Sequence, residues 1–283
     1  MNSGLAFKDD GYPNQRLLKP TITQTSEKPA MFKTLEALDT QQHAQLCYRG
    51  VDSYAFAQQV SWAPLACSEI IQAAREMPVM FTTGEHVRPV ALMGLRRDTN
   101  ALVSRDGRWK GRYIPAHLRR YPFLLGATGK ANEFVVMIDR AAPHFSLADE
   151  QVEGALAMFE GGQPMPEGIV EQARTFLLDF HHELEQSERW LAPLKEHDVL
   201  VERQLTLTRD GKKEVAVNGF AMVDVARLNA LDDATLAAWA RNGLLGLIFA
   251  HLHSQTNSNG LIQALEEPLA ETETAIETEK MES

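Results

Sequence analysis

The second half of the chain carries apolar residues at the spacing of amphipathic helices. Over residues 167–190 they recur every three or four positions, which predicts a long helix that lies against a sheet. Either of the aspartates at 232 and 233 can cap a further helix through residue 241, Gly243 can end it, and residues 244–253 then form a mostly buried helix. The apolar positions of the long helix are Ile169, Ala173, Phe176, Leu177, Phe180 and Leu184.

The first half, and one stretch of the second, alternates apolar segments with turn residues. After a short helix over 67–76, which Pro78 ends, this pattern predicts strands joined by tight turns. The connections are short, so neighbouring strands should pair antiparallel and the sheet should be local in sequence. The predicted hairpins are 79–82 with 87–95, 101–104 with 109–114, 123–127 with 133–138, and 199–207 with 214–223.

Both ends of the chain lack such patterns. Residues 1–30 are rich in small and polar residues without periodicity, which predicts a disordered arm, and translation could begin at Met1 or at Met31. Residues 264–283 carry alternating Thr and Glu and are expected to be an acidic disordered tail. The expected fold class is α+β over residues 31–263, with an antiparallel meander-type sheet and helices packed on one face.

Composition then limits location and partners. The longest apolar run, residues 243–252, is too short to cross a bilayer, and the first twenty residues hold no apolar core of a secretory signal. The two cysteines, Cys47 and Cys67, are too few for a disulfide framework or a zinc site and are expected as buried thiols. We therefore expect a soluble cytoplasmic protein. The net charge of −10 argues against binding to nucleic acid.

No motif of a nucleotide-binding, metallohydrolase or serine-hydrolase site is present, which leaves isolated candidate groups. His181 and Glu185 share a helix face and could form one edge of a metal site or simply a solvated face. His251 and His253 point to different sides of a helix, so each is expected to be a core or helix-end histidine. Asp139 ends a predicted strand and could be a base or a turn residue bonded to its own backbone.

Residues 108–123, here called the arginine segment, stand out by density. Residues 96–120 include eight basic residues and only two acidic ones. The sequence therefore predicts a positive patch on a protein that is acidic overall. Arginine and aromatic side chains bind anions and anchor interfaces. Three interpretations stay open: core rings with internally paired arginines, a carboxylate or anion site, and a protein-docking surface. The candidate binding residues are Arg108, Trp109, Arg112, Tyr113, Arg119, Arg120 and Tyr121.

These residues also carry a family resemblance. Gly107-Arg108-Trp109, Arg112-Tyr113-Ile114-Pro115-Ala116 and Arg119-Arg120-Tyr121-Pro122-Phe123 resemble the signature of the bacterial SapC-like proteins. Further similar segments are Met31-Phe32-Lys33, Pro89-Val90-Ala91-Leu92-Met93-Gly94-Leu95 and Gly219-Phe220-Ala221-Met222-Val223-Asp224. The resemblance extends from Met31 to about Gln263. It supplies no catalytic residues and implies no cofactor or metal.

What the resemblance implies about function is coarse. The family is named after a component of surface-layer systems, and relatives occur near genes for TonB-dependent receptors and flavin-dependent halogenase-like proteins. Our first hypothesis is therefore a non-catalytic accessory protein that holds an acidic protein partner or a carboxylate-bearing small molecule. The alternatives are an enzyme with dispersed residues, in which Arg112, Arg119 or Arg120 orients a substrate and Asp139 or a histidine moves a proton, and a structural component of a surface layer.

Overall fold

The computed structural model describes residues 6–8, 31–96, 98–130, 132–209 and 212–266. Contacts within it define two compact units that interleave along the chain, so no single cut separates them. The first unit comprises Met1–Ala57, Arg105–Arg108 and Ala116–Gln186, and the second comprises Gln58–Ser104, Trp109–Pro115 and Ser187–Ser283. One domain over residues 31–263 stays a prediction.

The first unit is built around strand β8 (Glu133–Asp139), in which buried residues alternate with half-buried ones. It pairs antiparallel with β7 (Phe123–Ala127), so the predicted hairpin is confirmed. Strand β1 (Ala6–Lys8) pairs with one end of β8 and β2 (Leu35–Ala37) with the other. The predicted arm over residues 1–30 thus contains a short strand, and its remaining residues lie outside the described ones.

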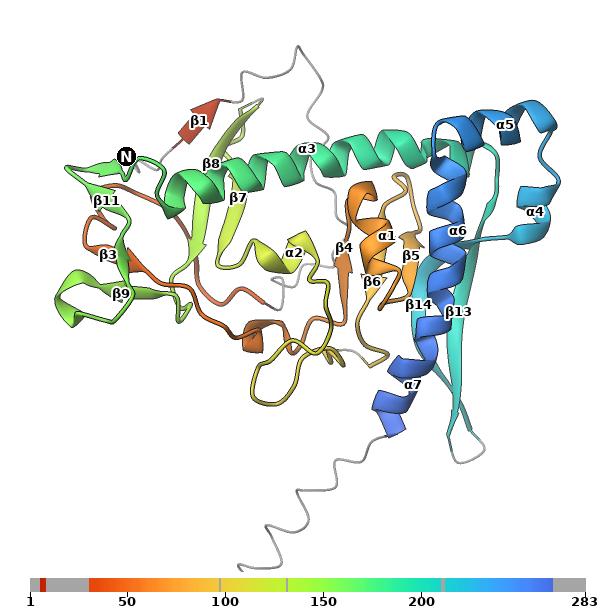
Figure 1. The fold of residues 1–283 in the computed structure, drawn as a ribbon, viewed down its shortest axis with the longest axis horizontal. Helices are drawn as coiled ribbons and strands as arrows, with labels where there is room; N and C mark the ends of the chain where they lie inside the picture. Colours follow the sequence, from red (N-terminus) through yellow and green to blue (C-terminus); the bar gives the residue numbers. More distant parts are fainter. Residues whose placement is uncertain (1–5, 9–30, 97, 131, 210–211, 267–283) are drawn as a thin grey trace, which may run out of the picture. The chain divides into compact units, whose positions relative to one another are not determined.

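Helix α3 (Ile169–Glu196) confirms the predicted long helix and continues beyond residue 190, with Pro193 inside its last turns. In the first unit its apolar face packs on the sheet, as Figure 1 shows for the part beside β7 and β8. Val170, Ala173 and Leu177 form one core cluster with residues of these strands. The helix period of the sequence therefore marked the buried face correctly.

Smaller elements complete the first unit. Strand β3 lies between β9 and β10 in a second, three-stranded sheet, and β11 and β12 form a two-stranded ribbon. The bounds are β3 Leu46–Tyr48, η1 Ala55–Ala57, α2 Ala116–Arg119, β9 Phe145–Leu147, η3 Ala148–Glu150, β10 Leu156–Ala157, β11 Phe159–Glu160 and β12 Gln163–Pro164.

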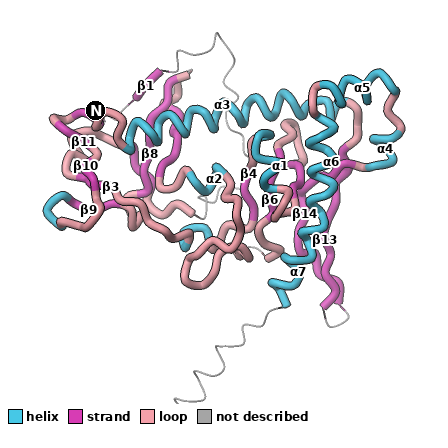
Figure 2. Tube along the Cα trace, in the orientation of Figure 1, coloured by secondary structure: helices cyan, strands magenta, loops and turns pink. Residues whose placement is uncertain are grey.

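The second unit contains an antiparallel sheet in the order β13-β14-β5-β6-β4. The hairpins β5–β6 and β13–β14 match the prediction, and Figure 2 shows β13 and β14 as long neighbouring strands. Yet β14 also pairs with β5, which precedes it by more than a hundred residues, so the sheet is not local in sequence. The bounds are β4 Trp62–Pro64, β5 Val79–Thr82, β6 Pro89–Leu92, β13 Leu200–Arg209 and β14 Lys212–Val223.

Helices cover both faces of this sheet, which corrects the expectation of helices on one face. Helix α6 (Leu244–Ser254) places His251 against Phe81 on one face. Helix α7 (Ser258–Glu266), which the sequence did not predict, packs Leu261 into a cluster on the other face. Because the strands carry apolar residues on both faces, each face needs a cover. That cluster contains Met80, Val90, Leu92 and Leu95.

The remaining helices follow their sequence signals. Asp232 caps α5, since its side chain accepts a hydrogen bond from the Thr235 backbone at 2.9 Å, and Gly243 has the positive φ of a helix end. The predicted helix over 67–76 is a 3₁₀ turn followed by one α-turn. The bounds are η2 Cys67–Glu69, α1 Ile70–Ala73, α4 Val225–Asn229, α5 Asp233–Arg241 and η4 Gln255–Asn257.

Two further predictions, the hairpin over 101–114 and the start of the acidic tail, need correction. The hairpin over 101–114 reduces to one bridge between Val103 and Trp109, because a carboxylate takes up the backbone N–H groups of Arg112 and Tyr113 instead of a second strand. The acidic tail was predicted from residue 264, but α7 extends to Glu266. Residues 267–283 of the tail lie outside the described ones.

Candidate functional site

The fold divides the arginine segment between the two units. Arg108, Arg119, Arg120 and Tyr121 belong to the first unit, and Trp109, Arg112 and Tyr113 belong to the second. The seven candidate residues are therefore treated as two groups, each within its own unit.

In the second unit two glutamates organise the segment. The Glu76 carboxylate accepts hydrogen bonds from the backbone N–H of Arg112 at 2.6 Å and of Tyr113 at 3.4 Å. Buried Glu69 accepts one from the Tyr113 hydroxyl at 2.6 Å. Trp109 is half-buried, whereas the side chain of Arg112 is exposed. The backbone and ring of this group thus serve the fold, and only the Arg112 side chain extends into solvent.

The exposed arginines of the first unit make local contacts. Arg108 donates from Nε to Asp106 at 2.7 Å, and both side chains are largely exposed. The guanidinium of Arg119 lies over the ring of Phe176 on α3, 5.3 Å from its centre. Exposed ion pairs and exposed cation–π contacts contribute little to stability. These two side chains therefore lie on the surface of the unit.

Tyr121 belongs to a saturated polar network. Its hydroxyl donates to Oδ2 of Asp139 at 3.1 Å, and that carboxylate is fully buried. Asp139 also accepts from the backbone N–H of Lys33 at 2.9 Å, Thr34 at 2.8 Å and Ala141 at 3.3 Å. Burial first, then the charge of Asp139 and the bond to it, raise the pKa of Tyr121 above its usual range.

This network occupies both oxygens of Asp139, the residue considered as a base. A carboxylate whose two oxygens accept four hydrogen bonds has little capacity left for a substrate proton. The bond from the Ala141 backbone N–H agrees with the alternative, a turn residue bonded to its own backbone. The bonds from Lys33 and Thr34 in addition join Asp139 to a segment far away in the sequence. They hold the backbone of residues 33 and 34 against the end of β8.

Aromatic rings surround Tyr121. Phe56 stacks on it with ring centres 3.9 Å apart, Phe32 lies at 5.5 Å, and His144 meets it edge to face at 5.4 Å. Phe32 directly precedes the two backbone N–H groups that Asp139 holds, so the carboxylate fixes the position of that ring. We call Phe32, Phe56, Tyr121 and His144 the aromatic cluster.

Arg120 lies at this cluster with a different status from the other arginines. Its guanidinium carbon is 5.8 Å from the ring centre of Phe32, and its Nε is buried with no hydrogen-bond partner among the described residues. Burial lowers the pKa of Arg120 to about 10, so the side chain remains charged at neutral pH. A desolvated cation whose donor lacks an acceptor is costly unless an anion pairs with it.

Two buried histidines near Arg120 and Tyr121 are held neutral. Burial and, second, the charge of Arg120 lower the pKa of His117 well below its usual value. Burial and the charge of Arg49 lower the pKa of His144 to about 4, and the Nδ1 of His144 is buried without a partner in the described part of the chain. The sequence prediction missed both histidines. The available signal was the spacing of His117 and Arg120, one helical turn apart.

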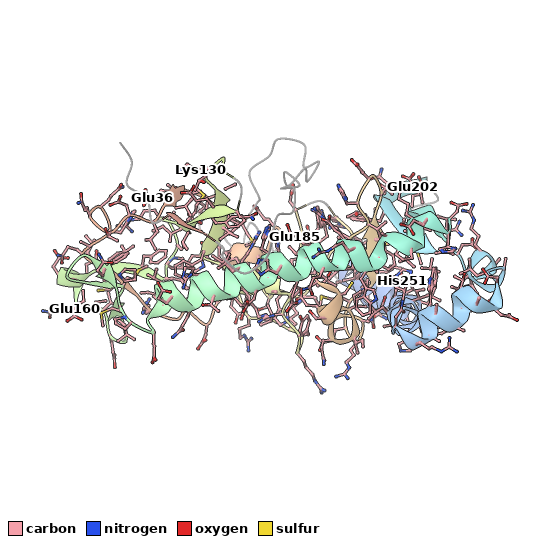
Figure 3. All side chains as sticks on the ribbon, turned by 90° about the horizontal axis from the view of Figure 1, so that it is seen from above. Glu36, Lys130, Glu160, Glu185, Glu202 and His251 are labelled. Carbon is pink, nitrogen blue, oxygen red and sulfur yellow. The ribbon has the colours of Figure 1, made fainter. Side chains whose placement is uncertain are left out.

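The other titratable candidates take structural positions. The Nδ1 of His251 donates to the Val79 carbonyl at 2.6 Å and its Nε2 accepts from the Val223 backbone at 3.2 Å, which confirms a satisfied core histidine; Figure 3 shows it among the side chains of α6. His253 is exposed. His181 and Glu185, the latter labelled on α3 in Figure 3, lie 3.6 Å apart. The described residues contain no group of three or more metal-ligating side chains.

Both cysteines are free thiols, but only one is fully buried. Cys67 is buried in the second unit, where its backbone N–H donates to the Ser187 hydroxyl at 2.7 Å. Burial raises the pKa of Cys67 to about 11, so its thiol stays protonated and unreactive. Cys47 is half-buried, which corrects half of the expectation of two buried thiols.

Fold and site together define an α+β protein in which the buried Asp139 carboxylate is saturated by donors and the Nε of Arg120 is buried without an acceptor among the described residues, beside an aromatic cluster. A protein-family comparison matches the SapC family over residues 38–261, so the chain belongs to the SapC family and the predicted family is confirmed. Neither the curated proteins nor the solved structures contain a match. Within the described residues no helix is long and apolar enough to cross a membrane.

Proposed function

We propose that this SapC-family protein is a non-catalytic accessory protein that binds a carboxylate group at Arg120. The family name supports a role linked to surface-layer biogenesis, and an uptake or modification system for a small molecule would use the same binding step. The carboxylate could belong to a small molecule or to an acidic protein partner. The two free thiols of the chain, Cys47 and Cys67, support a reducing, cytoplasmic compartment.

The observation that carries the proposal is the state of Arg120. Arg120 is half-buried, its Nε donor is closed to solvent and has no acceptor among the described residues, and its guanidinium lies over the ring of Phe32. A cation–π contact replaces part of the lost hydration of a guanidinium but leaves its N–H groups unsatisfied. A carboxylate fits the planar fork of arginine. It neutralises the positive charge and also accepts hydrogen bonds from the N–H groups.

The state of the nearby titratable groups favours binding over catalysis. His117 is neutral with a pKa well below its usual value, which makes it a weak base at neutral pH. Asp139, the other group considered for proton transfer, is saturated by four donors. The surface-layer alternative rests on the family name alone, since it draws on no feature of the site.

The direct test is equilibrium binding of defined carboxylate probes, measured by isothermal titration calorimetry. The probes are sodium hexanoate, sodium benzoate, sodium glutamate and an oligoglutamate peptide, the last standing for an acidic protein surface. We expect at least one probe to bind the wild-type chain and to bind Arg120→Met roughly ten- to a hundredfold more weakly, because a hydrogen bond to a charged group contributes about 1.5–3 kcal/mol.

The matched control is Arg108→Met, which removes an exposed arginine of the same unit whose Nε donates to Asp106. It should bind hexanoate, benzoate and glutamate as the wild type does. Binding that is equal in the wild type and in Arg120→Met would refute the proposal, and so would the absence of binding by all four probes.

A further inference from the structure

We infer that the ligand of the Arg120 site is a small apolar monocarboxylic acid, and that His117 is its second polar contact. This inference rests on the proposed function and narrows it to one class of ligand.

The geometry comes from the short helix α2, which ends at Arg119. The Arg120 backbone N–H donates to the Ala116 carbonyl at 3.0 Å and that of Tyr121 to the Leu118 carbonyl at 3.1 Å, so the helical turn includes Arg120. Residues three apart on such a turn lie on one face. The charge of Arg120 acts on His117, which agrees with this placement. One cation and one neutral imidazole therefore face the same direction.

Arg120 contributes one positive charge to this face, so a ligand with a single negative charge would neutralise it. His117 and His144 are neutral, and the carboxylate of Asp139 is occupied by its own donors. Arg119, the other cation on the turn, is exposed and lies over Phe176, and Arg49, whose charge acts on His144, is exposed as well. A monocarboxylate neutralises Arg120 alone, whereas a phosphate or a dicarboxylate would leave a second charge in a desolvated environment.

The burial of the Arg120 Nε and of His117 favours a small apolar ligand over an acidic protein surface. The Nε of Arg120 is closed to solvent, and His117 is 8% exposed, so a carboxylate must leave bulk water to reach them. Phe32 under the guanidinium is 4% exposed, and the rings of the aromatic cluster supply apolar surroundings. A protein partner would instead meet the exposed side chains of Arg108 and Arg119.

His117 would act as a neutral donor beside the charged one. A neutral imidazole carries one ring N–H, which can donate to the carboxylate oxygen that Arg120 does not hold. We class His117 as a binding residue, because in this arrangement it touches the ligand. Its replacement should weaken binding less than replacement of Arg120, since a neutral donor forms a weaker bond than a charged one.

The experiment combines calorimetry with NMR of the arginine Nε–H groups of the full chain. Hexanoate and benzoate represent apolar monocarboxylates, and succinate, inorganic phosphate and oligoglutamate are the competitors. We expect the first two to bind at least about tenfold more tightly than each competitor. They should shift mainly one Nε–H resonance, the one that is missing from the spectrum of Arg120→Met.

Variants of His117 separate binding from folding. His117→Phe should weaken hexanoate binding several-fold, and His117→Gln, which keeps an N–H donor, should recover most of it. His253→Gln, a change at an exposed histidine, is the control and should have no effect. The amide spectrum of each variant shows whether the fold is retained. Equal losses in His117→Phe and His117→Gln, with both folded, would remove His117 from the site.

The outcomes distinguish this inference from the proposal beneath it. If phosphate, succinate or oligoglutamate binds through Arg120 as tightly as hexanoate, the anion site stands and the ligand class is wrong. If no probe binds, or if none depends on Arg120, the proposed function fails as well.

Discussion

Arg120 and Asp139 are charged residues of the same unit, and they differ in how far their buried polar atoms are hydrogen-bonded. Asp139 is fully buried and accepts hydrogen bonds from three backbone N–H groups and the Tyr121 hydroxyl. Arg120 precedes Tyr121 in the chain, yet its buried Nε has no acceptor among the described residues. The difference teaches that a buried charge which is saturated serves the structure, whereas one that lacks a partner is available to a ligand.

The largest expected effect tests the saturated side of this comparison. Asp139→Ala should lower the free energy of unfolding by about 3–5 kcal/mol, because each buried donor left without an acceptor costs about 1–3 kcal/mol. Urea denaturation measures the change. The control is Asp106→Ala, an exposed carboxylate of the same unit, with an expected loss below about 0.5 kcal/mol. Similar losses in the two variants would contradict a structural role for Asp139.

The second prediction sharpens the comparison with histidines. His251 has both ring nitrogens bonded, whereas His144 has a buried Nδ1 without a partner in the described part of the chain. At neutral pH, His251→Phe should therefore lower the free energy of unfolding by about 2–3 kcal/mol, and His144→Phe should lower it by less than about 1 kcal/mol. Equal losses in urea denaturation would show that bonding of the ring nitrogens does not decide stability at these sites.

The same two histidines predict a pH dependence. Burial lowers the pKa of both His251 and His144 to about 4. As pH falls below about 6.5 the unfolded chain binds protons that the folded chain does not, so stability falls until pH reaches about 4. From pH 7 to about pH 5 His251 should account for about 2 kcal/mol of this loss, and His144, which is partly screened by solvent, for about 1 kcal/mol. Either substitution by Phe should make the curve flatter, and an unchanged curve would refute the assignment.

A smaller effect is expected on the unsaturated side. Arg120→Met keeps an apolar stem and removes a desolvated charge, so the free energy of unfolding should stay the same or rise by about 1 kcal/mol. Thermal and urea denaturation measure it. A fall of more than about 2 kcal/mol would mean that the guanidinium supports the fold, and the comparison on which the binding proposal depends would then be withdrawn.

The smallest effect belongs to the exposed pair of Arg108 and Asp106. A double-mutant cycle with alanine at both positions should give a coupling energy below about 1 kcal/mol, and high salt should reduce it further. A larger or salt-insensitive coupling would show that this exposed arginine is also structural. Arg120 would then no longer differ in kind from its neighbours.

Much of the fold followed from local pattern. The helix period around residue 177, the hairpin of β7 and β8 and the cap at Asp232 each reflect a preference that a few neighbouring residues express by themselves. The pairing of β14 with β5, the second cover by α7 and the loss of the hairpin over 101–114 involve partners far apart in the chain, such as Glu76 and Arg112. Local pattern contains no information on such partners.

The candidate site divides in the same way. Its residue types were visible in the sequence, because arginine and aromatic density is a local property, and the SapC family could be recognised from the same residues. Only the tertiary structure distinguished Arg120 from Arg108, Arg112 and Arg119, since burial and the presence of an acceptor depend on what the rest of the chain brings near each guanidinium. The sequence by itself determined which groups the protein has, and tertiary packing decided which of them remains unsatisfied.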